Sequence, residues 1–228
     1  MTVNTTPKKV FNNFFFLLFF LPIYIGGVAQ NLTSDNKLIF KTISFDEKID
    51  FGSNDNQTSW GITSILNNTK VSLSGNQIND FVFDKPGQYQ IQYSDNKDHS
   101  GDTCHEDKFP HTMIIEVSAT KMTYDFSKIN FSHDIQIGST SDIIISVPIS
   151  IVSKNNKVTK SNLEKLTIAG IGCELVATPL QKEIDLITGT QILKFSVSGI
   201  ISKPTYLMFD FIDCNNQVQT YNLPQIIN

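Results

Sequence analysis

The sequence predicts an all-β protein in which two antiparallel β-sandwich domains follow one another behind an N-terminal signal peptide. Three observations support this prediction. A basic and then apolar segment opens the chain, short alternations of apolar and polar residues fill most of the remainder, and clusters of Asn, Asp, Gly, Ser and Pro separate those alternations. The roughly 200 residues behind the apolar segment are enough for two ordinary domains.

The first 29 residues have the order of a secretory signal. Lys8 and Lys9 precede the apolar run 14–25, and small residues follow at 26–29. We expect cleavage after Ala29, which leaves a protein that is periplasmic, on the cell surface or secreted. A retained membrane anchor is the alternative, but the run is shorter than the about 20 apolar residues of a spanning helix and contains a proline. No cysteine follows the run directly, so we expect no lipid anchor and no membrane span after cleavage.

The charge of the chain argues against nucleic acid as a partner. Removal of the signal leaves sixteen lysines against twenty-two acidic residues, a formal net charge of −6. An acidic surface does not attract the phosphate backbone. All eighteen basic residues are lysine, and the absence of arginine together with many Asn, Ile and Phe residues is typical of an AT-rich bacterial genome.

The first predicted domain covers residues 30–120. Its clearest expected strands are 70–74, 80–83, 89–94 and 112–118. In the stretch 89–94, Tyr89, Ile91 and Tyr93 share one face, which we expect to be core, because successive side chains of a strand point to opposite faces.

The second predicted domain covers residues 121–228 and has longer strands. They are expected at 142–153, 165–177, 191–201, 206–213 and 217–222, and residues 214–216 are expected to form a hairpin turn. Pro148 predicts an edge position or a bulge, because proline cannot donate to a sheet ladder. Residues 162–166 are the best helical candidate. The boundary is expected near residues 119–123, where one strand ends and the next begins with almost no linker. The alternative to two domains is one continuous β-domain, because the size ranges of single and paired domains overlap.

The stretch from Phe83 to Tyr93 resembles the penultimate-strand signature of PKD-type and related immunoglobulin-like domains. In that signature an apolar residue precedes a Pro-Gly turn, here Pro86-Gly87-Gln88-Tyr89, and alternating apolar positions follow. The resemblance implies immunoglobulin-like sandwiches, and a spacer, adhesive or carbohydrate-associated role. We expect the turn to aim Tyr89 into the core, where its hydroxyl fastens the corner. The first domain lacks the cysteine pair that bridges the two sheets in many such domains.

A histidine-rich loop is the first candidate site. His99, Cys104, His105 and His111 lie within thirteen residues, and His, Cys and carboxylate side chains are ligands of zinc and copper. The spacing matches no standard metal motif, so a polar loop with incidental histidines is the alternative. The site predicts about one metal ion per chain.

Cysteine pairing is the second candidate. In an exported protein, Cys173 and Cys214 can form a disulfide across the second domain. The alternative is that both are small buried residues with free thiols.

No sequence motif of a known catalytic type occurs: the chain has no GxSxG elbow, no HExxH pair and no phosphate-binding glycine loop. We therefore expect a non-enzymatic exported protein without a cofactor, a structural, adhesive or assembly module with a protein or surface glycan as partner. The alternatives are a metal-binding module built on the histidine-rich loop and a carbohydrate-binding accessory module. Trp60, expected in a turn, can stack on a sugar or anchor the core.

Overall fold

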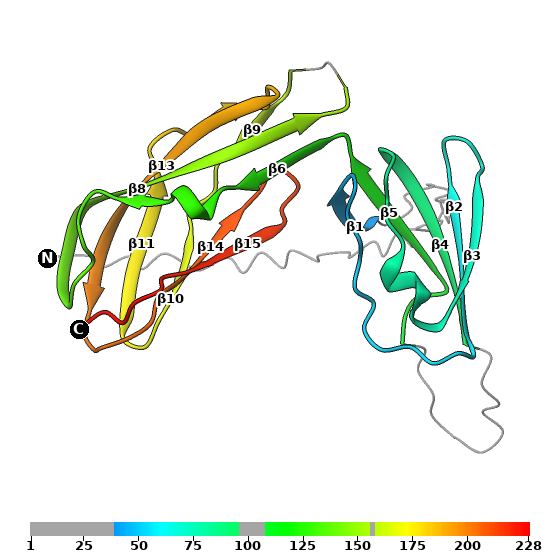
Figure 1. Ribbon diagram of the computed structural model, residues 1–228, viewed down its shortest axis with the longest axis horizontal. Helices are drawn as coiled ribbons and strands as arrows, with labels where there is room; N and C mark the ends of the chain where they lie inside the picture. Colours follow the sequence, from blue (N-terminus) through cyan, green and yellow to red (C-terminus); the bar gives the residue numbers. More distant parts are fainter. Residues whose placement is uncertain (1–38, 96–107, 156–157) are drawn as a thin grey trace, which may run out of the picture. The chain divides into compact units, whose positions relative to one another are not determined.

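The computed structural model describes residues 39–95, 108–155 and 158–228 (Figure 1). These residues form fifteen β-strands and two short 3-10 helices, so the prediction of an all-β protein is confirmed. In this part of the chain no helix is long and apolar enough to cross a membrane. The predicted signal peptide, residues 1–29, lies outside the described residues.

The N-terminal strands form one five-stranded sheet in the order β1-β5-β4-β2-β3 (Figure 1). The strands are β1 (Ile39–Ser44), β2 (Thr58–Ser64), β3 (Lys70–Ser74), β4 (Gly87–Asp95) and β5 (Thr112–Ser118), with the 3-10 helix η1 (Gly75–Asp80) after β3. β1 pairs with β5 in parallel, which the expectation of purely antiparallel sheets did not include. The other neighbours are antiparallel.

One face of this sheet is apolar because alternate residues of each strand point to it. In β4 the predicted residues Tyr89, Ile91 and Tyr93 are all buried, which confirms the expected core face. Phe51 and Ile78, which lie outside the strands, complete the same cluster. Among the described residues, loops and η1 therefore cover this face in place of a second regular sheet.

The C-terminal part contains two larger sheets and a short strand pair. The first sheet has the order β11-β13-β8-β6, with β7 also paired to β8, the second has the order β10-β14-β15, and β9 pairs with β12. The strands are β6 (Thr120–Tyr124), β7 (Asn130–Phe131), β8 (Gly138–Ser153), β9 (Lys160–Asn162), β10 (Thr167–Ala169), β11 (Cys173–Pro179), β12 (Glu183–Asp185), β13 (Gly189–Ile201), β14 (Met208–Ile212) and β15 (Val218–Asn222), and η2 (Phe126–Lys128) follows β6.

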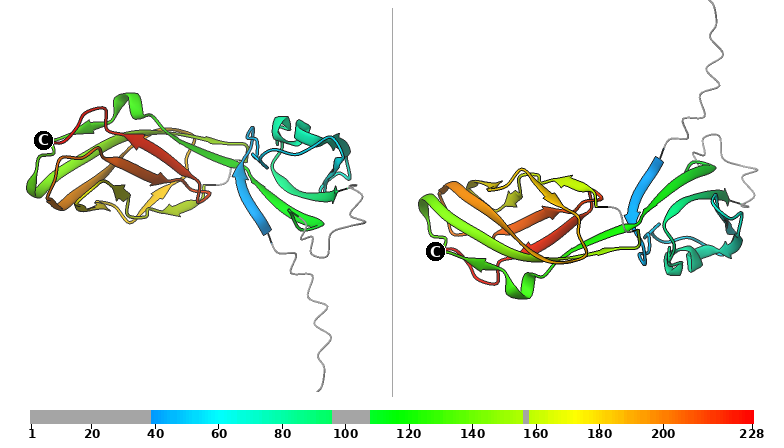
Figure 2. Two further views of the ribbon diagram at one scale, coloured as in Figure 1. Left: turned by 90° about the horizontal axis from the view of Figure 1, so that it is seen from below. Right: turned by 90° about the horizontal axis from the view of Figure 1, so that it is seen from above.

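Side chains from both larger sheets share one core. Val147 of β8, Phe195 of β13 and Phe211 of β14 are buried in the same cluster. In Figure 2 the orange-red β14 and β15 strands form a layer of their own against the longer β8 and β13 strands. Burial of these large side chains, about 25 cal/mol per Å² of apolar surface, is the main stabilising contribution of this part.

Pro148 lies in a central strand, because β8 pairs with β13 on one side and with β6 on the other. The expected edge position is therefore wrong, and Pro148 is not in a bulge either, because its register with Ile192 of β13 is regular. The ladder of β6 ends at the pair Tyr124↔Ile149, and β7 begins its pairing at Ser146, so Pro148 falls between them. Its carbonyl oxygen accepts the Asp125 N–H at 2.8 Å. A residue without an N–H group is tolerated here because no partner strand needs its donor.

Several expected elements differ from the observed ones. Residues 80–83 are not a strand: Asp80 ends η1, and Phe83 makes a single bridge to Glu47. The expected strand 165–177 is interrupted between β10 and β11 by a turn that contains Gly172 with φ +66°. Residues 162–166 form no helix, because Asn162 ends β9 and Leu166 bridges to Ala177.

Candidate functional site

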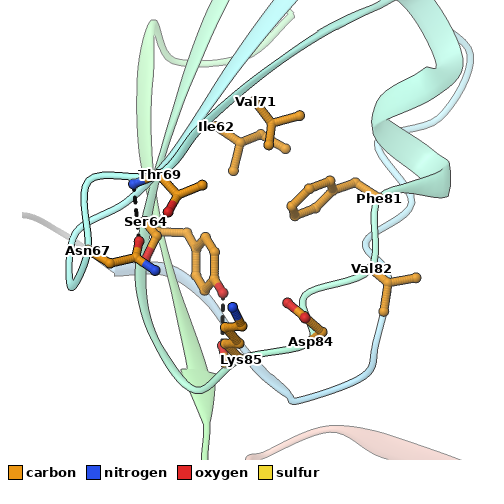
Figure 3. Close-up of a pocket in the computed structure, with 10 residues that line it drawn as sticks. Ile62, Ser64, Asn67, Thr69, Val71, Phe81, Val82, Asp84 and Lys85 are labelled. Carbon is orange, nitrogen blue, oxygen red and sulfur yellow. Dashed lines mark hydrogen bonds between the residues drawn. The ribbon is translucent and has the colours of Figure 1, made fainter.

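A cleft beside β3 is the candidate site, and we call it the β3 cleft (Figure 3). It is a cavity of about 400 Å³ that opens to solvent. Its lining residues come from β2, the β2–β3 hairpin, the segment after η1, and β4; they are Ile62, Ser64, Asn67, Thr69, Val71, Phe81, Val82, Asp84, Lys85 and Tyr89.

The β2–β3 hairpin forms one wall. Its turn closes because the Asn68 N–H donates to the Ser64 carbonyl at 2.8 Å, and the Ser64 N–H donates to the Thr69 carbonyl at 2.9 Å. Asn68 has a φ of +57°, a conformation that asparagine tolerates better than most residues. The Asn67 side-chain oxygen accepts the Thr69 N–H at 3.1 Å. These bonds place the polar side chains of the turn at one rim of the cleft (Figure 3).

The segment after η1 forms the opposite wall. The bridge between Phe83 and Glu47 anchors it, and the ring of Phe81 meets that of Phe83 edge to face at 4.8 Å. This contact turns the Phe81 ring into the cleft, where Figure 3 shows it facing Ile62. Val82 lies at the mouth with 41 % of its surface exposed, although exposed apolar surface is unfavourable in water.

Tyr89 belongs to the buried end of the cleft. Its hydroxyl donates to the Lys85 carbonyl oxygen at 3.0 Å, as the sequence predicts for the corner after Pro86. Gly87 has a φ of +130°, a conformation that few other residues adopt, and so it permits the turn. Burial, with the nearby Asp84 carboxylate second, raises the pKa of Tyr89, so the hydroxyl keeps its proton and acts as a donor.

The chemistry of the β3 cleft is that of a binding site. Ile62, Val71 and Phe81 supply an apolar floor, and amide, hydroxyl, carboxylate and ammonium groups stand at the rim. The ten lining residues include no histidine or cysteine, and Asp84 is their one carboxylate. Such a cleft stabilises an apolar group by burial and orients it through a few polar contacts.

The histidine-rich loop falls mostly outside the described residues: His99, Cys104 and His105 lie in the range 96–107. His111 is described, and its carbonyl oxygen accepts the Tyr93 N–H at 2.9 Å. In the ranges that the structure describes, no group of three or more His, Cys, Asp or Glu side chains is arranged for a metal ion. The zinc or copper site stays a prediction.

The structure does not bring Cys173 and Cys214 together. Both are partly buried, and both have free thiols. Cys173 begins β11 close to the pair Ala169↔Met208, whereas Cys214 lies beyond the other end of β14. Six residues of extended chain separate Met208 from Cys214, about 20 Å, and a disulfide needs α-carbons within about 7 Å. In this structure the two cysteines are therefore separate, partly buried thiols.

Trp60 lies in β2 and not in a turn, and it is 1 % exposed. Its indole N–H donates to the Gly75 carbonyl at 3.0 Å, and its ring packs against Tyr93 at 4.9 Å between centroids. Trp60 is therefore a core anchor and cannot stack on a sugar.

Sequence reasoning missed the β3 cleft because its residues come from three separate segments. One signal was present: Ile65 and Leu66 are apolar residues in a turn of otherwise polar residues, and both are exposed. No protein-family model matches this chain, and no curated protein matches it.

Proposed function

We propose that this chain is an exported, non-enzymatic protein whose N-terminal β-domain attaches to a partner through the β3 cleft. The proposal is of a cell-surface or periplasmic adhesive or assembly module with two tandem immunoglobulin-like domains behind the signal peptide 1–29. The single observation that carries it is an open cavity with an apolar floor and a polar rim.

The tandem architecture has support from the packing. One apolar cluster ends at Val117 and the next begins at Met122, so each predicted domain, 30–120 and 121–228, has a core of its own. The bond from the Tyr89 hydroxyl to the Lys85 carbonyl oxygen resembles the tyrosine corner of immunoglobulin-like domains.

The partner contact has support from the surface. Val82 and Leu66 are exposed beside the cavity and its hairpin, and exposed apolar groups around a hollow are typical of sites that bind proteins. A protein partner fits better than a glycan, because the aromatic rings that line the cavity, Phe81 and Tyr89, are partly or fully buried.

An attachment assay tests this function. The mature chain, beginning at Gln30, is coated on beads, and bead retention on cell envelopes of the source organism is measured for the wild type and for Val82→Glu. The matched control is Val176→Glu on β11, because Val176 is 45 % exposed and Val82 is 41 % exposed. We expect beads with the wild type and with Val176→Glu to be retained equally. Retention of Val82→Glu beads should fall about tenfold or more, because a charge at the mouth of the cavity opposes the burial of an apolar group. Equal retention of all three chains contradicts the proposal.

A further inference from the structure

The outer edge of β3 carries backbone groups that no strand takes up. β3 is the last strand of its sheet, and within the described residues no strand pairs with its outer side. The hydrogen-bond alternation shows which residues face that side. The Ser64 N–H donates to the carbonyl oxygen of Thr69, on the side of β3. The next N–H, that of Ile65, donates to the carbonyl oxygen of Gln88 in β4, on the other side.

From that alternation, Val71 and Leu73 direct their N–H and C=O groups to β2, and Lys70 and Ser72 direct theirs outward. The end of the edge is closed, because the Ser74 N–H donates to the Gln77 side chain at 2.9 Å. Lys70 and Ser72 therefore present two donors and two acceptors in the spacing of a strand.

The same edge borders the β3 cleft. The Val71 side chain lines the cavity, and in Figure 3 it lies beside Ile62, across from the ring of Phe81. A strand added to this edge lies about 4.8 Å from β3, and its side chain directly opposite Val71 points to the same face. That side chain enters the cavity between Val71 and Val82.

We infer that the β3 cleft binds an extended peptide segment of a partner protein, which adds antiparallel to the edge of β3 and buries one bulky apolar side chain. The inference deepens the proposed function and rests on it. The residues opposite Lys70 and Ser72 point to the polar face, where an acidic residue pairs with Lys70 and threonine pairs with Ser72. Because the segment runs antiparallel to β3, its sequence from the N-terminus is Thr opposite Ser72, an apolar residue opposite Val71, and Glu opposite Lys70.

A second copy of the chain is a poorer occupant. If β3 paired with β3 of another copy, Val71 and Leu73 would have to supply the side chain that enters the cavity. Both already pack against their own core. The occupant must bring an apolar side chain that is free, as an extended segment of another protein does.

The test uses a synthetic probe and the mature chain labelled with ¹⁵N. The probe is an acetylated nine-residue peptide with Thr-Phe-Glu at its centre and alternating threonine and valine on both sides. We expect the amide signals of Lys70 and Ser72 to shift on titration and their hydrogen exchange to slow. The same peptide N-methylated at the central Thr and Glu loses those backbone bonds, and we expect its Kd to rise about tenfold or more.

Two variants at one position separate strand addition from other binding. Ser72→Pro removes an outward N–H and leaves the bonds to β2 intact, whereas Ser72→Ala keeps the N–H. We expect the Kd of the probe to rise about tenfold for Ser72→Pro and to stay at the wild-type value for Ser72→Ala. If Ser72→Pro does not fold by circular dichroism, the N-methylated probe makes the same distinction with the wild-type chain, because it lacks the backbone N–H groups that strand addition needs.

Three results overturn the inference: no shift at millimolar probe, binding that is insensitive to N-methylation and to Ser72→Pro, or self-association of the free chain that Ser72→Pro abolishes. If the probe fails but Val82→Glu still loses attachment to envelopes, the inference is wrong and the proposed function stands. If the probe binds and Val82→Glu keeps full attachment, the peptide site stands and the proposed function is wrong.

Discussion

The Tyr89 hydroxyl donates a hydrogen bond of 3.0 Å to the backbone carbonyl oxygen of Lys85, four residues earlier in the chain. The bond closes the corner between the wall of the β3 cleft and β4, and the ring of Tyr89 also meets Phe83 edge to face at 5.2 Å. One side chain therefore holds both the start of β4 and the residue that anchors the opposite wall.

Tyr89→Phe removes this bond and keeps the ring. We expect the free energy of unfolding to fall by about 1 kcal/mol, the usual net value of one such bond. Urea unfolding measures it, with Tyr206→Phe as the control, because Tyr206 is 65 % exposed. Equal stabilities of the two variants would show that the corner does not depend on the hydroxyl.

Gly199→Ala should be far more damaging than Gly189→Ala. Both glycines lie in β13 with a similar φ, +137° and +139°, so both variants carry about 1–3 kcal/mol of backbone strain. A β-carbon at Gly199 would stand 2.1 Å from the Glu174 carbonyl oxygen, whereas at Gly189 it meets nothing within 4 Å. We expect an additional loss of about 1–3 kcal/mol for Gly199→Ala, read from urea midpoints. The same midpoint for both variants contradicts this packing.

The Cys214 thiol should be protected from ionisation. Burial, with the neighbouring Asp213 carboxylate second, raises the pKa of Cys214 from 9.0 to about 12. At about pH 10 we expect iodoacetamide to alkylate Cys214 about a hundredfold more slowly in the folded chain than in urea, because the thiolate is the nucleophile. Tandem mass spectrometry of the alkylated peptide measures the rate, and equal rates would contradict a buried thiol.

The raised pKa of Cys214 also gives a stability trend with a definite sign. The folded thiol holds its proton more tightly than the unfolded thiol, so its stabilisation is present below about pH 9 and is lost as the pH rises through about 12. Cys214→Ala should therefore flatten the fall in the free energy of unfolding over that range. If the free energy of unfolding of Cys214→Ala falls as steeply with pH as that of the wild type, groups other than Cys214 cause the fall.

The redox state of Cys173 and Cys214 is a separate prediction. We expect non-reducing peptide mapping of the purified chain to recover Cys173 and Cys214 as free thiols, because the fold separates them by the length of β14. A peptide that contains both residues joined by a disulfide would contradict the described arrangement of β11 and β14.

Much of the fold follows from local pattern. The strands at Lys70–Ser74 and Thr112–Ser118 have the bounds that alternation predicts, and the turn at 214–216 follows from its Asn residues, since Asn216 has a φ of +60°. Alternation is a property of single strands, so it identifies them without knowledge of their partners.

The rest depends on which segments meet. The pairing of β1 with β5 joins residues that are far apart in sequence, and nothing local to Ile39–Ser44 specifies a parallel partner. The strand expected at 80–83 fails for a similar reason: η1 and the single bridge to Glu47 are tertiary outcomes. The β3 cleft is assembled from three such segments, so only its Tyr89 corner was predictable.

The most direct measurement is photo-crosslinking on intact cells that produce the chain, with p-benzoylphenylalanine at position 82 or at position 176. The two positions have similar exposure but differ in whether they line the β3 cleft. We expect one discrete protein adduct from position 82, which the Thr-Phe-Glu probe competes away, and no adduct from position 176. Adducts of equal yield from both positions, or a position 82 adduct that the probe does not reduce, would contradict this expectation.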